Sequence, residues 1–328
     1  MGCRSFFACG GTNIAVWGGK KSPMAQQSTS SNTFLPHLAL VGCNLLWAVD
    51  YPLYHILLPR YLSPVLLLSA ALTATALLAL IPAIKGGVQR IEHKDIPTLI
   101  GAALLLGVIH KGTLMMGLSR TSPVDGSIIN TVGPLVVLLL SVLMGVDRLT
   151  RTKVIGLIVG LSGAVAIILM GNHTSSAVAT MEGNLFVVCA VVATACYTVF
   201  LKRMLAKYNV ATVLLWVYVI ATVIVLPFGI SDLVKSDFAG WNREATVAFI
   251  VIMCFLTYLP NFLYNYALRH IKPFQTSIFS YLQPVAAIVL SVAMRLDKVR
   301  LETLLFALLV FAGIGIVLWS YRPTKGAS

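Results

Sequence analysis

Two charged side chains stand inside long apolar stretches and are the residues of this sequence best suited to chemistry. Asp50 lies in the stretch 35–58, and Lys111 lies in the stretch 97–118. A charge at the centre of a membrane-spanning helix costs about 2.5–3.5 kcal/mol, so such residues are kept for ion pairing or for contact with a solute. At a rise of about 1.5 Å per residue, each lies about 5 Å beyond the midpoint of its stretch, and both stretches run in the same direction. We expect the two charges at one depth, either as an ion pair that holds helices together or as flanks of a bound solute.

Aromatic and polar residues accompany Asp50 along one broad helical face. Asn44, Trp47, Tyr51 and Tyr54 recur at spacings of three or four residues, which places side chains on the same side of a helix. An aromatic ring that lines a cavity can stack on an organic solute or on its cation. Trp47 and Tyr54 are therefore candidate solute-binding residues, with an interfacial aromatic belt as the alternative for Tyr54.

The composition indicates that membrane helices position these residues. Apolar residues make up 58% of the chain and charged residues 11%, and the mean hydropathy is +0.89, so the chain is too apolar for an ordinary soluble domain. A stretch of about 18–24 apolar residues crosses the hydrocarbon core of a lipid bilayer. The predicted fold is an all-α polytopic membrane protein with ten transmembrane helices, at 35–58, 64–84, 97–118, 124–145, 153–171, 182–201, 210–230, 245–268, 274–294 and 302–321.

An internal duplication relates the two halves of the chain. Residues 117–166 align without a gap with residues 267–316 at a constant offset of 150. Five spans per half is an odd number, so the second copy begins on the opposite side of the membrane and the two five-helix repeats are inverted. The predicted parts are a disordered cytoplasmic tail, two repeats and a short cytoplasmic tail, at 1–34, 35–173, 174–321 and 322–328.

The same offset places polar side chains on equivalent helices. Lys111 aligns with Asn261, and Asn130 aligns with Ser280. Because unpaired amides are costly in hydrocarbon, Asn261, Asn265 and Gln283 should face the interior of the helix bundle. They are candidates for solute binding, and hydrogen bonding between helices is the alternative. The remaining candidates of this kind are Asn130 and Tyr281.

Proline and glycine predict two further features. Pro134 and Pro284 occupy matching positions within their spans, where a proline removes a backbone hydrogen bond and kinks the helix, either as a gating element or as a static bend. Gly156, Gly160 and Gly163 recur at spacings of three or four residues, which permits close helix contact. That contact lies either within the chain or in a homodimer.

The loop charges predict the orientation in the membrane. With the N-terminus inside, the inner loops and tails hold sixteen Lys and Arg residues and the outer loops hold seven. Cytoplasmic loops carry this excess of positive charge. We therefore expect a multi-pass protein of the cell membrane, inner or plasma, with both termini in the cytoplasm.

Short motifs in both copies of the repeat point to a known family. The motifs are Gly117–Pro123, Ile128, Pro134, Ser141, Asp147–Thr150, Gly156 and Leu161–Gly163, and then Tyr266–Pro273, Tyr281–Pro284 and Phe311–Gly313. With these motifs the chain is similar, over about residues 36–321, to EamA-type carriers of the drug/metabolite transporter superfamily. The resemblance implies a ten-helix inverted-repeat fold, a central cavity, and export or exchange of small metabolites. Many members carry Gly-Glu where this chain has Asp147 and Asp297 after Val or Leu.

Several function classes are excluded or disfavoured. The net charge of +13 comes from short basic clusters between apolar runs, which indicates loop charge rather than a nucleic-acid partner. The six cysteines have no metal-ligand spacing, so we expect neither a metal nor a cofactor. No phosphate-binding loop, HExxH pair or other catalytic cluster is present. A membrane-embedded lipid-modifying enzyme is therefore the alternative rather than the leading interpretation, and no catalytic residue is assigned.

The leading interpretation is a secondary active carrier that works by alternating access. Lys111 suits a carboxylate, which favours an amino-acid-like or other small organic solute, coupled to protons or to a counter-solute. Carriers of organic cations, drugs or phosphorylated sugars on the same fold are alternatives, because one fold serves unrelated solutes.

Overall fold

The computed structural model describes residues 34–144, 150–170, 180–234, 236, 238, 240–296 and 301–319. Within this part of the chain every regular element is helical. Eight helical segments in it are long and apolar enough to cross a membrane. The carboxylates Asp147 and Asp297 lie outside the described residues, as do the predicted C-terminal tail and the predicted N-terminal tail up to residue 33.

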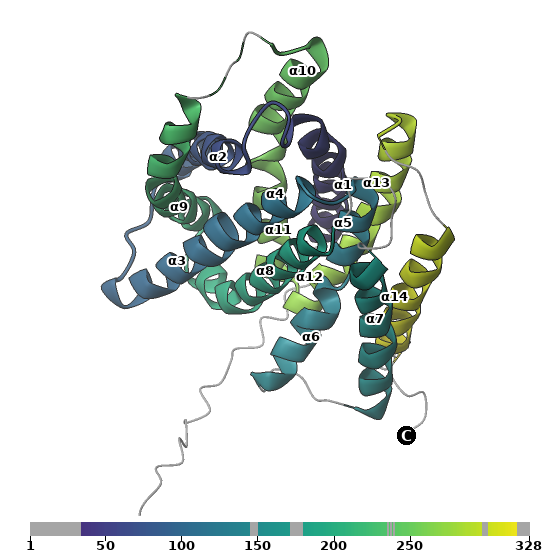
Figure 1. The fold of residues 1–328 in the computed structure, drawn as a ribbon. Helices are drawn as coiled ribbons and strands as arrows, with labels where there is room; N and C mark the ends of the chain where they lie inside the picture. The colour runs from purple at the N-terminus through teal and green to yellow at the C-terminus, as the bar shows by residue number, and fades with distance from the viewer. Residues whose placement is uncertain are drawn as a thin grey trace, which may run out of the picture. The chain divides into compact units, whose positions relative to one another are not determined.

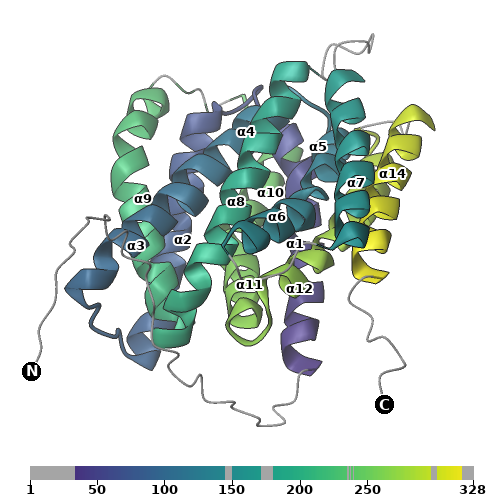
Figure 2. The ribbon, with the colours of Figure 1, turned by 90° about the horizontal axis from the view of Figure 1, so that it is seen from below.

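Helices occupy all ten apolar stretches, and Figures 1 and 2 show their arrangement in two perpendicular views. Unbroken helices form six of them, and the other four stretches each contain two or more helical pieces. The unbroken helices are α1 (Phe34–Leu57), α2 (Pro64–Gly86), α7 (Arg151–Met170), α8 (Met181–Lys207), α9 (Val210–Leu233) and α14 (Leu301–Trp319). The pieces are η1 (His93–Asp95), α3 (Ile96–Ala102), η2 (Ala103–His110) and α4 (Lys111–Leu118); α5 (Pro123–Asn130) and α6 (Gly133–Leu143); α10 (Arg243–Val251), η3 (Ile252–Leu256) and α11 (Leu259–His270); and α12 (Pro273–Ile278), η4 (Phe279–Tyr281) and α13 (Leu282–Ala293).

Polar capping residues fix where several helices begin. At five helix starts a side-chain oxygen accepts a backbone N–H of the first helical turn at 2.6–3.1 Å. Such caps satisfy donors that have no partner within the helix. The capping residues are Ser63, Ser122, Thr180, Asn209 and Asn242.

The interruptions fall at matching places in the two halves. A π-helical segment, η2, leads directly into Lys111, and its counterpart η3 occupies the same part of the second copy. A π-turn inserts an extra residue and so changes which side chains face a neighbouring helix. The chain also breaks between α5 and α6, and again at η4. Both breaks come just before Pro134 and Pro284, which stand in the first turn of the next helix, where a proline costs no hydrogen bond.

The helices associate across the two sequence halves. Helix α1 packs mainly against α11 and α13, whereas α8 packs mainly against η2, α4, α5 and α6. We call these groups the α1 bundle (α1, α11, α13) and the α8 bundle (η2, α4, α5, α6, α8). Each bundle combines the first helix of one half with later helices of the other. Two further pairs, α2 with α9 and α7 with α14, pack extensively beside them.

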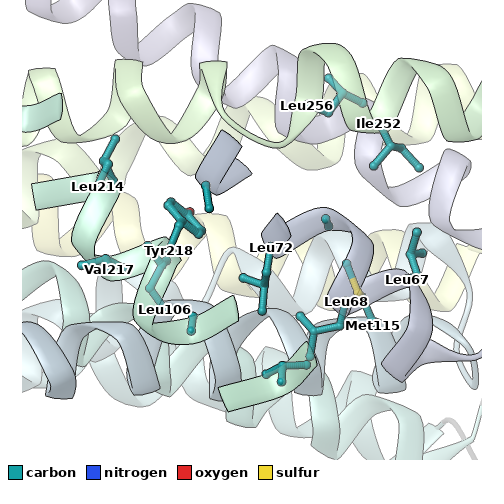
Figure 3. Close-up of a cluster of buried hydrophobic side chains, with 14 of the residues drawn as sticks. Leu67, Leu68, Leu72, Leu106, Met115, Leu214, Val217, Tyr218, Ile252 and Leu256 are labelled. Carbon is teal, nitrogen blue, oxygen red and sulfur yellow. The ribbon is translucent and has the colours of Figure 1, made fainter. Parts of the chain in front are cut away.

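Apolar side chains fill the space between these helices. A large buried cluster includes Leu72 from α2, Leu106 from η2 and Tyr218 from α9, as the close-up in Figure 3 shows. In the α7–α14 pair, glycines allow the two helix backbones to touch without a side chain between them. A Cβ added to Gly156 would lie 2.5 Å from the carbonyl oxygen of Gly313, so the two backbones are in direct contact. The predicted close contact at Gly156 is therefore made within the chain.

Candidate functional site

A cavity lies between the α1 bundle and the α8 bundle, and both contribute to its wall. Its lining is mixed: amides, hydroxyls, aromatic rings and two opposite charges stand among apolar groups. A concave site of this composition within a helix bundle is typical of small-molecule binding.

The two charges come from opposite walls. Asp50 on α1 and Lys111 at the start of α4 both line the cavity, and each residue is only 5% exposed. They influence each other electrostatically. No ion pair with an N–O distance within 4.0 Å joins them, and the buried Oδ1 of Asp50 has no hydrogen-bond partner. The two charges are thus near enough to interact, but they do not form a direct ion pair.

A chain of amides crosses the cavity at Gln283 on α13. The Oε1 atom of Gln283 accepts from Asn130 Nδ2 at 2.8 Å and from the hydroxyl of Tyr51 at 3.3 Å. Its Nε2 donates to Asn44 Oδ1 at 2.6 Å. Asn44 in turn donates to the Leu40 carbonyl at 2.7 Å. Gln283 therefore joins α1 and α13 to α5 of the opposite bundle, and buried networks satisfied in this way are rigid.

A second set of contacts ties α8 to α11. Thr198 and Tyr264 share a hydrogen bond of 2.7 Å, and the Tyr197 hydroxyl donates to Asn265 Oδ1 at 2.8 Å. One helical turn further along α8, the ammonium of Lys202 donates to the carbonyls of Leu268, Arg269 and Ile271 at the C-terminal end of α11. These contacts close the space between the two bundles on one side of the cavity.

An imidazole stands next to Lys111. His110 lines the cavity, and its Nδ1 lies 2.9 Å from the Ala190 carbonyl on α8. A carbonyl can only accept, so Nδ1 carries the proton, and Nε2 is an acceptor when the ring is neutral. No group of three or more His, Cys, Asp and Glu side chains in the described part of the chain is arranged to hold a metal ion.

The sequence matches the EamA-like transporter family twice, over residues 35–169 and 181–319. The chain belongs to the EamA-like transporter family. It is therefore a multi-pass membrane transporter, and the resemblance seen in its motifs is confirmed. An uncharacterized transporter of Archaeoglobus fulgidus is 27% identical over 258 residues, which are 79% of this chain and 90% of that protein. The uncharacterized transporter YetK of Bacillus subtilis is 20% identical over 67% of each chain.

A solved crystal structure has the same fold as this EamA-like transporter. It superposes with a TM-score of 0.63 over 88% of this chain and 98% of that chain, at 17% sequence identity. At this identity the likeness concerns the fold alone.

Most of the residues singled out in the sequence of this EamA-like transporter meet at the cavity. The lining residues among them come from six different helices. They are Trp47, Asp50, Lys111, Asn130, Pro134, Asn261 and Gln283.

Three other candidates lie elsewhere, two of them buried and Tyr281 partly buried, and Pro284 is not among the lining residues. Tyr54 belongs to the large apolar cluster and is 1% exposed. Asn265 bonds to Tyr197 and to the Asn261 carbonyl. Tyr281 packs edge-on against Phe311, with ring centroids 5.7 Å apart. These side chains support the wall rather than face the cavity.

Several lining residues of this EamA-like transporter were not among the sequence candidates. Thr194, Thr198 and Tyr264 line the cavity, and the Tyr264 ring lies 5.2 Å from that of Trp47. Their signal in the sequence is weak, because a threonine or tyrosine in an apolar helix can satisfy itself on its own backbone or at the membrane interface. Which of them faces the cavity depends on the neighbouring helix, and the sequence does not identify that neighbour.

Proposed function

We propose that this transporter is a secondary active carrier that exports or exchanges small metabolites by alternating access. One observation carries the proposal: two opposite charges, Asp50 and Lys111, face one cavity from two different bundles without closing on each other. A buried charge without a direct partner is costly. Its retention in an otherwise apolar chain favours a role in binding a polar solute.

The topology that we propose is ten transmembrane helices in two inverted five-helix repeats. The offset of 150 in the sequence and the matching interruptions at η2 and η3 support it. The packing is also reciprocal, since α1 contacts α11 and α13 as α8 contacts α4 and α6. The excess of Lys and Arg in alternate loops supports cytoplasmic termini in the inner or plasma membrane.

The solute that we propose is amino-acid-like or another small organic molecule, driven by protons or by a counter-solute. The ammonium of Lys111 suits a carboxylate, and the rings of Trp47 and Tyr264 offer an apolar surface beside it. The cavity volume of about 80 Å³ suits a small solute in this conformation, since one water molecule already needs about 10–15 Å³.

Purified protein in liposomes tests the proposal. The vesicles are offered amino acids, organic acids, organic cations, sugars and sugar phosphates, with and without a pH gradient, and protein-free vesicles are the control. We expect protein-dependent movement of a small organic solute. Movement of none of these solutes, together with modification of a lipid, would replace the carrier by the alternative of a lipid-modifying enzyme.

A further inference from the structure

The two charges differ in which body of the protein they belong to. Asp50 lies on α1, which packs against α11 and α13, whereas Lys111 lies on α4, which packs against α8. A relative movement that opens or closes the space between the α1 bundle and the α8 bundle therefore changes the distance between the carboxylate and the ammonium. The binding energy of a solute that contacts both charges therefore depends on this movement.

The other polar groups of the wall are already largely engaged. Gln283 holds Asn44, Tyr51 and Asn130 in one network, and Thr198 is bonded to its own helix and to Tyr264. Two buried oxygens of the described lining have no hydrogen-bond partner, the hydroxyl of Ser280 and Oδ1 of Asp50, and only Asp50 is a charged group. The ammonium of Lys111 has three N–H donors, and the carboxylate of Asp50 lies beyond the 4.0 Å N–O distance of an ion pair with it. The strongest interactions still open at the cavity are thus one carboxylate acceptor and one ammonium donor.

The second half of the chain does not repeat this pair. The offset of 150 places Phe200 at the position of Asp50 and Asn261 at the position of Lys111. Phe200 is 48% exposed on the outer side of α8, and Asn261 donates to the carbonyl of Thr257. The cavity therefore offers one negative and one positive group, in one orientation only.

We propose that the solute is a zwitterion that bridges the two bundles, with its ammonium on Asp50 and its carboxylate on Lys111. This proposal rests on the proposed carrier function and specifies the solute and its part in the cycle. Each charge of the solute compensates the charge of one bundle, so the bound zwitterion draws the two walls together. A solute with one charge leaves the other wall uncompensated in the closed state and is moved slowly.

Matched solutes that differ only in charge test this proposal. The probes are leucine, its decarboxylated amine 3-methylbutylamine, and its deaminated acid 4-methylpentanoate, with the same three forms of phenylalanine and of glutamine. Uptake into proteoliposomes is corrected for passage through protein-free vesicles. We expect at least one of the amino acids to move about tenfold faster than its amine and its acid, which corresponds to about 1.4 kcal/mol.

Single substitutions should change the preference in opposite directions. In Lys111→Met the amine should gain relative to the amino acid, and in Asp50→Asn the acid should gain. The exchanged variant Asp50→Lys/Lys111→Asp keeps one charge of each sign and should again prefer the zwitterion. This exchanged variant also carries the test if a single variant fails to fold, as judged by size-exclusion chromatography and thermal unfolding in detergent.

The outcomes separate this proposal from the carrier function. Wild-type protein that moves the amine or the acid as fast as the amino acid overturns the zwitterion, and so do single variants that keep the wild-type preference. Wild-type protein that moves sugars or organic cations and none of the amino acids overturns the zwitterion and leaves the carrier intact. Failure to move any solute of the wider panel overturns the carrier function itself.

Discussion

The lysine at the end of α8 provides a test of how the cavity opens. Lys202 donates to three carbonyls at the C-terminal end of α11, at 2.9 Å for Arg269 and 2.7 Å for Ile271, with Leu268 as the third. These carbonyls have no partner within their own helix. Because α8 and α11 belong to different bundles, the contact holds the bundles together on that side. The substitution Lys202→Met keeps the apolar stem and removes the charge.

The size of the effect follows from the contacts. A hydrogen bond to a charged group contributes about 1.5–3 kcal/mol. Lys202 is half-buried, so water replaces part of what is lost. We therefore expect a net loss equal to about one such bond, and hence a shift of about ten- to a hundredfold toward the state in which this side is open. Thr198 and Tyr264 still hold the next turn, which limits the change.

Thiol labelling measures this shift. Ser277→Cys places a thiol in the cavity wall, in a chain whose own cysteines are replaced, and a charged thiol reagent is added at the cytoplasmic face of membrane vesicles. Labelling should accelerate about tenfold or more in Lys202→Met. Lys207→Met is the matched control, because Lys207 pairs with Asp95 and Glu92 before α3 and not with the α1 bundle. Equal labelling rates in the parent and in Lys202→Met, or the same acceleration in Lys207→Met, would refute the reasoning.

Three further substitutions test other parts of the structure, each by thermal unfolding in detergent. Gly313→Ala forces apart the α7–α14 contact and should destabilise the protein by about 1–3 kcal/mol, whereas Gly315→Ala, with no atom within 4 Å, should not; equal effects would contradict the close packing. Gln283→Leu removes three hydrogen-bond partners from the cavity wall and should cost about 2–3 kcal/mol, and an unchanged unfolding temperature would show that the network is dispensable. Two lysines hold the pKa of Glu92 below its usual range, so its ion pairs stabilise the protein above the ordinary glutamate pKa and are lost as the pH falls through the lowered pKa. The deficit of Glu92→Gln should accordingly be present at neutral pH and vanish in acid, and a deficit independent of pH would argue against the ion pairs.

The sequence was sufficient to predict the helices and the two charges, because long apolar runs and isolated charges have a direct physical cost. It placed Asp50 and Lys111 at one depth, and both line the cavity. It did not predict that α1 packs with the second half, since spacing along a helix defines a face and not the neighbour of that face. For the same reason Tyr54, on the face of Asp50, is buried in the apolar cluster.

Small changes in the facing of side chains along a helix could not be predicted from the sequence either. The π-helical segment η2 changes the facing of the residues that follow it, yet its apolar sequence resembles ordinary helix. Gln283 was expected to bind solute or to join helices, and its four-residue network became visible only with the helices in place.

The packing of α1 against helices of the second half determines when the protein can assemble during synthesis. The chain is synthesised from its N-terminus, so α1 enters the membrane first, whereas α11 and α13 follow more than two hundred residues later. Among the eight candidate spans, α1 has the lowest mean hydropathy, 1.2, and it contains Asp50. A helix with low hydropathy for a membrane span is therefore synthesised long before the helices that it packs against, which come near the end of the chain. The α8 bundle is complete once α8 has been made, whereas the wall that the α1 bundle forms cannot be completed until the last third of the protein has left the ribosome.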